Sequence, residues 1–252
     1  MKPISLWMAA AALVFQAASA DAACHAEGSV DIYDGTIGKA AVRVALQIKN
    51  GQVRGKYVHR ISQSDLPLKG TLDSSGRHLS LTEFDSAGHP TAKFAGTFAD
   101  RDAKFANGSP LNCEVVSGTW TASGKAPMNF KLSMSSSGPA DLAHLYDAAG
   151  VSNDEVVNKA ATSFREAVMH NRKDAVAKMI DYPIETSVNG KRTRIANAYA
   201  LIAHYDGIFT PAFRATIEGD FTRLMFARGQ GVMMGGGEVW FGPTGKVIAL
   251  NN

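Results

Sequence analysis

The stretch VRVALQIKNGQVRGKY, residues 42–57, indicates how the first half of the chain folds. Before its centre, apolar side chains occupy every second position, at Val42, Val44, Leu46 and Ile48. The centre is Asn50-Gly51, a pair that strongly favours the tight turn of a β-hairpin. After the turn the two-residue period returns, at Val53, Gly55 and Tyr57. The stretch therefore predicts two antiparallel strands, each with one apolar face.

The same alternation recurs along the rest of the first half. It predicts strands over residues 66–72, 78–85, 91–99, 114–122 and 128–134, joined by turns rich in Gly, Ser and Asp. Seven or eight short strands at this spacing are typical of an up-and-down barrel or a curled meander. Closing such a sheet removes the edges that would pair with other chains. We therefore expect an all-β N-terminal domain, a barrel or meander, over residues 21–134.

The second half changes to the periodicity of helices. A Ser-rich segment that includes Gly138-Pro139 predicts a linker over residues 135–152, and Asn153 is a candidate helix N-cap. Three helices are predicted: one from residue 153, one over 173–180 and one over 197–209, the last with Tyr199, Ile202, Tyr205 and Phe209 on one stripe. Asn189-Gly190 predicts a hairpin over residues 184–195. A short helix reaching residue 217 and strands over 221–227, 231–234, 238–241 and 246–250 complete an α+β domain, residues 153–252.

Two family resemblances follow from these patterns. The order of elements, together with FREAVMHNRKDAVAKMIDYPIE at residues 164–185 and GEVWF at 237–241, resembles the NTF2-like family. That resemblance implies a cone-shaped α+β fold with one pocket, shared by isomerases, dehydratases and non-catalytic binding or assembly domains. In the first half, GKY at 55–57, LTEFD at 81–85 and GTW at 118–120 look like the calycin-like barrels of exported bacterial proteins.

The N-terminus has the pattern of a secretory signal peptide. Lys2 precedes an apolar core, and Ala18-Ser19-Ala20 is a small-residue cleavage site, so we expect residues 1–20 to be removed. The protein is then periplasmic or secreted and not embedded in a membrane. An oxidising compartment favours a disulfide between Cys24 and Cys113, the only cysteines of the chain. Two unpaired thiols, or lipidation at Cys24, are the alternatives.

Several classes of function lack their signatures. The net charge of +3 is too small to favour nucleic acid or an anionic membrane surface as a partner. The seven histidines show no metal-binding spacing, and no nucleophile elbow is present. The glycines of residues 229–245 lie between predicted strands rather than before a helix, so they favour tight turns and not a phosphate loop. We therefore expect no metal and no cofactor.

The candidate site residues lie in the second half. The NTF2-like resemblance implies a carboxylate inside the cone, and we select Asp206 and Glu238, with Tyr182 and Tyr205 as hydroxyl donors. Strand alternation places Glu238 and Trp240 on one face, where they form a ligand-binding wall if that face lines the cone. If the face meets solvent, Glu238 only discourages edge pairing. Side chains two positions apart in a helix point to different sides, so His204, Tyr205 and Asp206 cannot all face one pocket. The alternative is that Tyr205 packs inward while His204 and Asp206 lie nearer the surface or cap the helix end.

These patterns favour a binding function without catalytic residues. We expect an exported two-domain protein that recognises a protein or a small envelope ligand, for example as an inhibitor or immunity protein of a cell-wall-active enzyme. The alternative is an NTF2-like isomerase or lyase that uses Asp206 or Glu238 as general base. A structural envelope component is a third interpretation, and the resemblance implies a homodimer through the C-terminal sheet as one mode of assembly.

Overall fold

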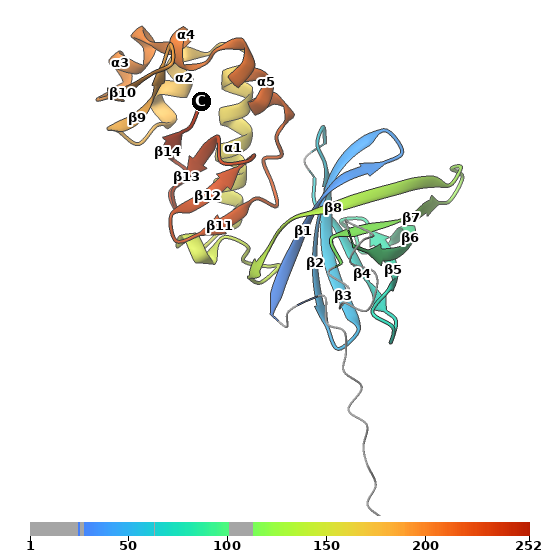
Figure 1. Cartoon of the computed structure of the whole chain (residues 1–252). Coiled ribbons are helices and arrows are strands. Elements are labelled where there is room, and N and C mark those ends of the chain that lie inside the picture. The colour runs from blue at the N-terminus through green and yellow to red at the C-terminus, as the bar shows by residue number, and fades with distance from the viewer. Residues whose placement is uncertain (1–24, 26–27, 63, 101–112) are drawn as a thin grey trace, which may run out of the picture.

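The computed structural model describes residues 25, 28–62, 64–100 and 113–252. Its N-terminal part is a closed antiparallel barrel in which each strand pairs with the next and β1 pairs with β8 (Figure 1). The strands are β1 (Ser29–Ile37), β2 (Ala40–Lys49), β3 (Gln52–His59), β4 (Leu66–Leu72), β5 (His78–Phe84), β6 (Pro90–Ala99), β7 (Val115–Ala122) and β8 (Met128–Pro139). The expected β-rich domain is therefore a barrel and not an open meander.

The hairpin of residues 42–57 forms as predicted. Lys49 pairs with Gln52, and the two residues between them have positive φ angles, 50° at Asn50 and 70° at Gly51. Two positive φ angles match the twist of a two-residue hairpin. The alternating apolar residues of β2 and β3 point into the barrel, where they join a core that includes Tyr57, Leu68, Phe94 and Phe130.

The ends of the barrel differ from the prediction in two ways. The sequence pattern did not assign β1, although its first half is buried. Residues 135–139, expected to begin the linker, continue β8, and Ser136 to Pro139 pair with Ile32 to Ser29. Strand pairing uses backbone groups, so a serine run can extend a strand whose side chains are half exposed. The connection between the two parts is therefore shorter than predicted, and it contains the short 3-10 helix η2 (Asp147–Ala149).

The C-terminal part combines helices with small antiparallel sheets. Its helices are α1 (Asp154–Met169), α2 (Lys173–Met179), α3 (Ala198–Ala203), α4 (Tyr205–Ile208) and α5 (Pro211–Gly219), and β9 (Ile184–Val188) and β10 (Lys191–Ile195) form a hairpin. The side chain of Asn153 accepts a 3.0 Å hydrogen bond from the Glu155 N–H, as expected of an N-cap. The predicted third helix is interrupted at His204, and Tyr199 is 83% exposed instead of facing the core.

The final four strands form one sheet in the order β11-β12-β13-β14. They are β11 (Phe226–Arg228), β12 (Gly231–Met234), β13 (Val239–Phe241) and β14 (Val247–Leu250). Residues 221–225 lie outside β11, so the predicted strand over 221–227 is largely wrong. One face of this sheet packs on α1, where the rings of Phe164 and Phe241 lie 6.0 Å apart between centroids.

The two parts of the chain share a packed contact. Val30, Ile32, Ala45 and Val58, on the outside of the barrel, belong to the same hydrophobic cluster as the helices and sheet of the C-terminal part. The Arg223 guanidinium crosses this contact, because it pairs with Asp65 of the barrel at 2.7 Å and with Glu155 of α1 at 2.7 Å. These apolar and ionic contacts position the C-terminal sheet relative to the barrel.

The predictions about export concern residues outside the described ones. Residues 1–20 and Cys24 are not among the described residues, so the signal peptide, the lipidation and the disulfide stay predictions. Cys113 itself is fully buried. Among the described residues, no helix is both long enough and apolar enough to cross a membrane.

Candidate functional site

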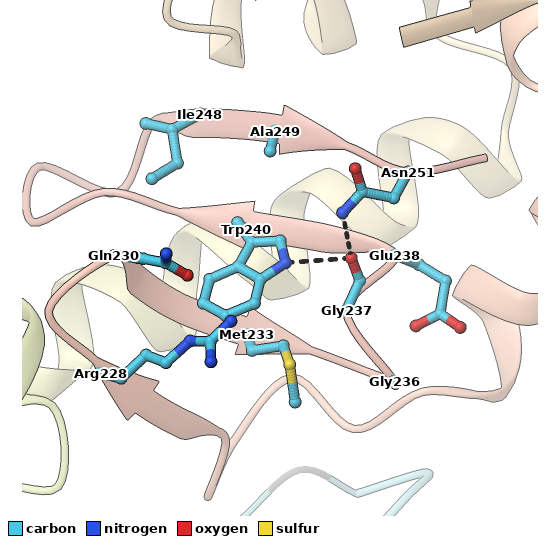
Figure 2. A pocket seen from close by; sticks show the side chains of 10 residues that line it. All are labelled: Arg228, Gln230, Met233, Gly236, Gly237, Glu238, Trp240, Ile248, Ala249 and Asn251. Carbon is cyan, nitrogen blue, oxygen red and sulfur yellow. Dashed lines mark hydrogen bonds between the residues drawn. The ribbon is translucent and has the colours of Figure 1, made fainter. Parts of the chain in front are cut away.

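A pocket of about 620 Å³ lies on the face of the C-terminal sheet that points away from α1 (Figure 2). Strand register forms its floor, because Met233 pairs with Trp240 and Trp240 pairs with Ala249, so their side chains share one face. The residues that line the pocket are Arg228, Gln230, Met233, Gly236, Gly237, Glu238, Trp240, Ile248, Ala249 and Asn251. The lining thus combines an apolar centre with polar side chains around it.

Trp240 is held in place from two sides. Its indole N–H donates a 3.0 Å hydrogen bond to the Gly237 carbonyl, and the same carbonyl accepts a 2.6 Å bond from the Asn251 side chain. The Arg228 guanidinium lies 4.9 Å from the centroid of the ring (Figure 2), a cation–π contact. Gly237 has a φ of 112°, which L side chains rarely adopt. These contacts fix the position of the indole ring at the centre of the pocket.

Glu238 lies at the rim of this pocket beside Asp220, the residue after α5. One oxygen of each carboxylate, Glu238 Oε2 and Asp220 Oδ2, is buried and has no hydrogen-bond partner among the described residues. Both oxygens lie within 2.4 Å of the point where a Cβ on Gly235 would stand, so they are close to each other. Burial, followed by the charge of Glu238, raises the pKa of Asp220 to about 6.

The five predicted site residues do not form one pocket. Glu238 and Trp240 share a face and line the sheet pocket, on the side of the sheet away from the helices rather than inside a cone. Tyr182 is half-buried, and its hydroxyl donates to the Ala177 carbonyl at 2.9 Å. Burial raises the pKa of Tyr182 to about 12.

Tyr205 and Asp206 point to different sides of the chain, as predicted. Tyr205 is buried in a stack on Phe209, with 4.5 Å between ring centroids. Asp206 is exposed at the surface, where it pairs with Lys173 at 2.7 Å and with Arg214 at 3.4 Å. The space between helices and sheet is occupied by the rings of Phe164, Phe209 and Phe241. Asp206 therefore does not face a pocket with the other candidates.

Sequence reasoning missed most residues that line the pocket, Arg228 among them, and also Asp220 beside it. Arg228 pairs with Gly231 at the end of β11, and no pattern in the sequence indicates that its side chain lies over Trp240. Asp220 meets Glu238 only because the end of α5 lies against the turn between β12 and β13. No local pattern encodes either contact. Within the described ranges, no group of three or more His, Cys, Asp or Glu side chains is arranged to hold a metal ion.

A second polar cluster lies inside the barrel and is fully hydrogen-bonded. The Glu83 carboxylate, 6% exposed, accepts bonds from the Tyr57 hydroxyl at 2.6 Å, the Thr91 hydroxyl at 2.6 Å and the Trp120 indole at 3.1 Å. These residues bring together GKY, LTEFD and GTW, the three motifs behind the calycin-like resemblance. Because three donors meet the carboxylate, the cluster acts as a structural anchor of the barrel.

Comparisons of the chain with protein-family models, with curated proteins and with solved structures gave no match.

Proposed function

We propose that the chain is an exported, periplasmic or secreted, two-domain protein that binds a ligand on the open face of its C-terminal sheet, without catalysis of its own. The observation that carries this proposal is the ordered Trp240 at the centre of a pocket of about 620 Å³. Binding sites of this size combine an apolar wall with a few fixed polar groups. A pre-ordered aromatic side chain loses little conformational entropy when a ligand binds.

The polar groups of the pocket define the chemistry of the ligand. Arg228 offers a cation, Glu238 offers a carboxylate, and Gln230 and Asn251 offer amides, all around the apolar Met233 and Trp240. A ligand with both charged and apolar groups complements this surface, whether it is a protein segment or a small molecule of the cell envelope. In one form of this function, the protein inhibits a cell-wall-active enzyme or confers immunity to it.

The fold is consistent with this proposal. An eight-stranded closed barrel, each strand paired with the next, supports a calycin-like N-terminal domain. Two helices, a hairpin, further helices and a closing antiparallel sheet support an NTF2-like C-terminal domain. Both folds serve binding as well as catalysis, so the function is argued from the pocket and not from the fold.

A comparison of matched variants tests the proposal. The chain starting at residue 21 is immobilised as wild type, as Arg228→Ala and as Tyr199→Ala; Tyr199→Ala is the control, because Tyr199 is exposed and lies outside the pocket. Envelope extract is passed over each, and retained proteins and small molecules are identified by mass spectrometry. We expect at least one species on wild type and Tyr199→Ala that Arg228→Ala loses. The same set of species on all three baits would contradict the proposal.

One observation favours a second candidate, an isomerase or lyase. Glu238 faces the pocket and lies beside Asp220, whose raised pKa of about 6 is the property that a general acid or base needs near neutral pH. In this alternative Glu238 acts as the general base that transfers a proton of the substrate, and the neighbouring Asp220 adjusts the basicity of Glu238. Glu238→Gln would then abolish turnover of a substrate while leaving its binding and the thermal unfolding midpoint nearly unchanged. A binding protein keeps its ligand and has no turnover to lose.

A further inference from the structure

The carboxylates of Glu238, at the rim of the sheet pocket, and of Asp220 beside it pose a chemical problem. Asp220 Oδ2 and Glu238 Oε2 are both acceptors when ionised, both are buried, and neither has a donor among the described residues. A Cβ at Gly235 would meet them at 2.3 and 2.4 Å, so the two oxygens are at most the sum of these distances apart. Two neighbouring buried charges of the same sign, without donors, are costly.

One proton resolves both unsatisfied atoms. If Asp220 Oδ2 carries it, its O–H donates to Glu238 Oε2, and one hydrogen bond satisfies the two orphan oxygens. We propose that Asp220 and Glu238 share one proton, and that its loss loosens the glycine turn of residues 235–237 beside the pocket. This inference goes beyond ligand binding, and it holds whether or not a ligand is present.

The surrounding charges leave this pair uncompensated. From the barrel, the Arg43 cation acts on Asp220, but its guanidinium is engaged with Asp34, at 2.6 Å for Nε and 2.8 Å for Nη2. From α1, Arg165 donates at 3.0 Å to the backbone carbonyl of Asp220 and not to its carboxylate. Asp34 adds a further negative charge that raises the pKa of Asp220, after burial and Glu238, whereas the two arginines lower it.

Asp220 and Glu238 lie between the segment that contacts the barrel and the sheet pocket. On one side of Asp220, the Gly219 carbonyl accepts a 3.4 Å bond from Arg60. On the other side, Phe221 lies beneath the Arg43 guanidinium, 4.8 Å from the ring centroid. Glu238 lines the pocket itself. The shared proton therefore lies between the segment that contacts the barrel and the turn that borders the ligand site.

The turn at Gly235 is the segment that loosens when Asp220 and Glu238 lose their shared proton. Gly235 has a φ of 67°, and a side chain there would collide with both carboxylates. The carboxylates thus fill the space beneath the turn. When both are ionised, their repulsion acts on this glycine segment, which has little side-chain packing to resist it.

Carboxyl-carbon NMR titration of the chain from residue 21 tests the proposal directly. Resonances are assigned with Asp220→Asn and Glu238→Gln, and exposed Asp206 is the internal control. We expect a coupled titration of the pair with one midpoint near pH 6, which moves toward the ordinary aspartate value in Glu238→Gln. Independent titration of Asp220 and Glu238, with no coupling between them, would overturn the proposal, and the wild-type titration alone shows this if a variant does not fold.

Amide hydrogen exchange measures the second half of the proposal. After correction for the intrinsic pH dependence, residues 235–238 should exchange about tenfold faster at pH 7.5 than at pH 5, while the β9–β10 hairpin stays unchanged. Equal corrected protection of residues 235–238 at the two pH values would contradict the coupling of the proton to the turn.

Discussion

The Tyr57 hydroxyl donates a 2.6 Å hydrogen bond to the Glu83 carboxylate in the interior of the barrel. Burial, then the hydrogen bond and charge of Glu83, raises the pKa of Tyr57 well above its usual range. The tyrosine therefore stays protonated and remains a hydrogen-bond donor at neutral pH. The relationship joins β3 to β5, which are not neighbours in the barrel.

Removal of the Glu83 carboxylate should destabilise the barrel strongly. Glu83→Ala leaves the buried donors of Tyr57 and Trp120 without an acceptor and removes the partner of the exposed Thr91 hydroxyl, which should lower the free energy of unfolding by about 2–5 kcal/mol. Urea unfolding measures this loss, and Ser80→Ala, at an exposed position of the same strand, is the control. A loss below about 1 kcal/mol would show that the network does not anchor the barrel.

The ion pairs of Arg223 should stabilise the contact between the two parts of the chain. Arg223→Ala removes a half-buried guanidinium that meets Asp65 and Glu155, and we expect a loss of about 1–3 kcal/mol. Arg192→Ala removes an exposed pair with Glu185 and should cost about 0–1 kcal/mol. Chemical unfolding of both variants gives the comparison. Equal losses would mean that Arg223 does not join the parts.

Stability should fall as pH rises through the titration of Asp220. Its pKa is raised from 3.8 to about 6, so the folded chain holds this proton more tightly than the unfolded chain. The contribution of Asp220 to the free energy of unfolding is therefore largest below pH 4, decreases up to about pH 6 and is constant above it. Asp220→Asn cannot titrate, and its amide can donate to Glu238.

Asp220→Asn should therefore be more stable than wild type at pH 7.5, by about 1 kcal/mol once the partial exposure of Asp220 is allowed for. Unfolding curves at pH 4.5 and pH 7.5 measure the difference, with Asp206→Asn as control. If the stability of Asp220→Asn relative to wild type is the same at both pH values, the loss of stability with rising pH does not come from Asp220.

The sequence predicted the parts of the fold that depend on local patterns. The Asn50-Gly51 and Asn189-Gly190 turns, the Asn153 cap and the alternation of Glu238 with Trp240 are encoded within a few residues of each other. The strand extension over residues 135–139 could not be predicted, because serines carry no apolar period and only β1 supplies the partner backbone.

The candidate site was predicted in part, for a similar reason. Strand parity placed Glu238 and Trp240 together, but the face that they share is decided by which side packs on α1. Tyr205 and Asp206 were selected because the NTF2-like resemblance implies an open pocket inside a cone. In the structure, aromatic rings fill the space between the helices and the sheet. Asp220 and Arg228 enter the site through tertiary contacts between segments whose sequences give no sign of them.

The indole N–H resonances of the two tryptophans in residues 21–252 test the central claim most directly. Trp240 reports on the sheet pocket through its bond to Gly237, and Trp120 reports on the barrel interior through its bond to Glu83. When a ligand retained by the immobilised chain is added to the ¹⁵N-labelled protein, we expect the Trp240 resonance to move with saturation while the Trp120 resonance stays in place. Movement of Trp120 with Trp240 unchanged would locate binding in the barrel and contradict a binding site on the C-terminal sheet.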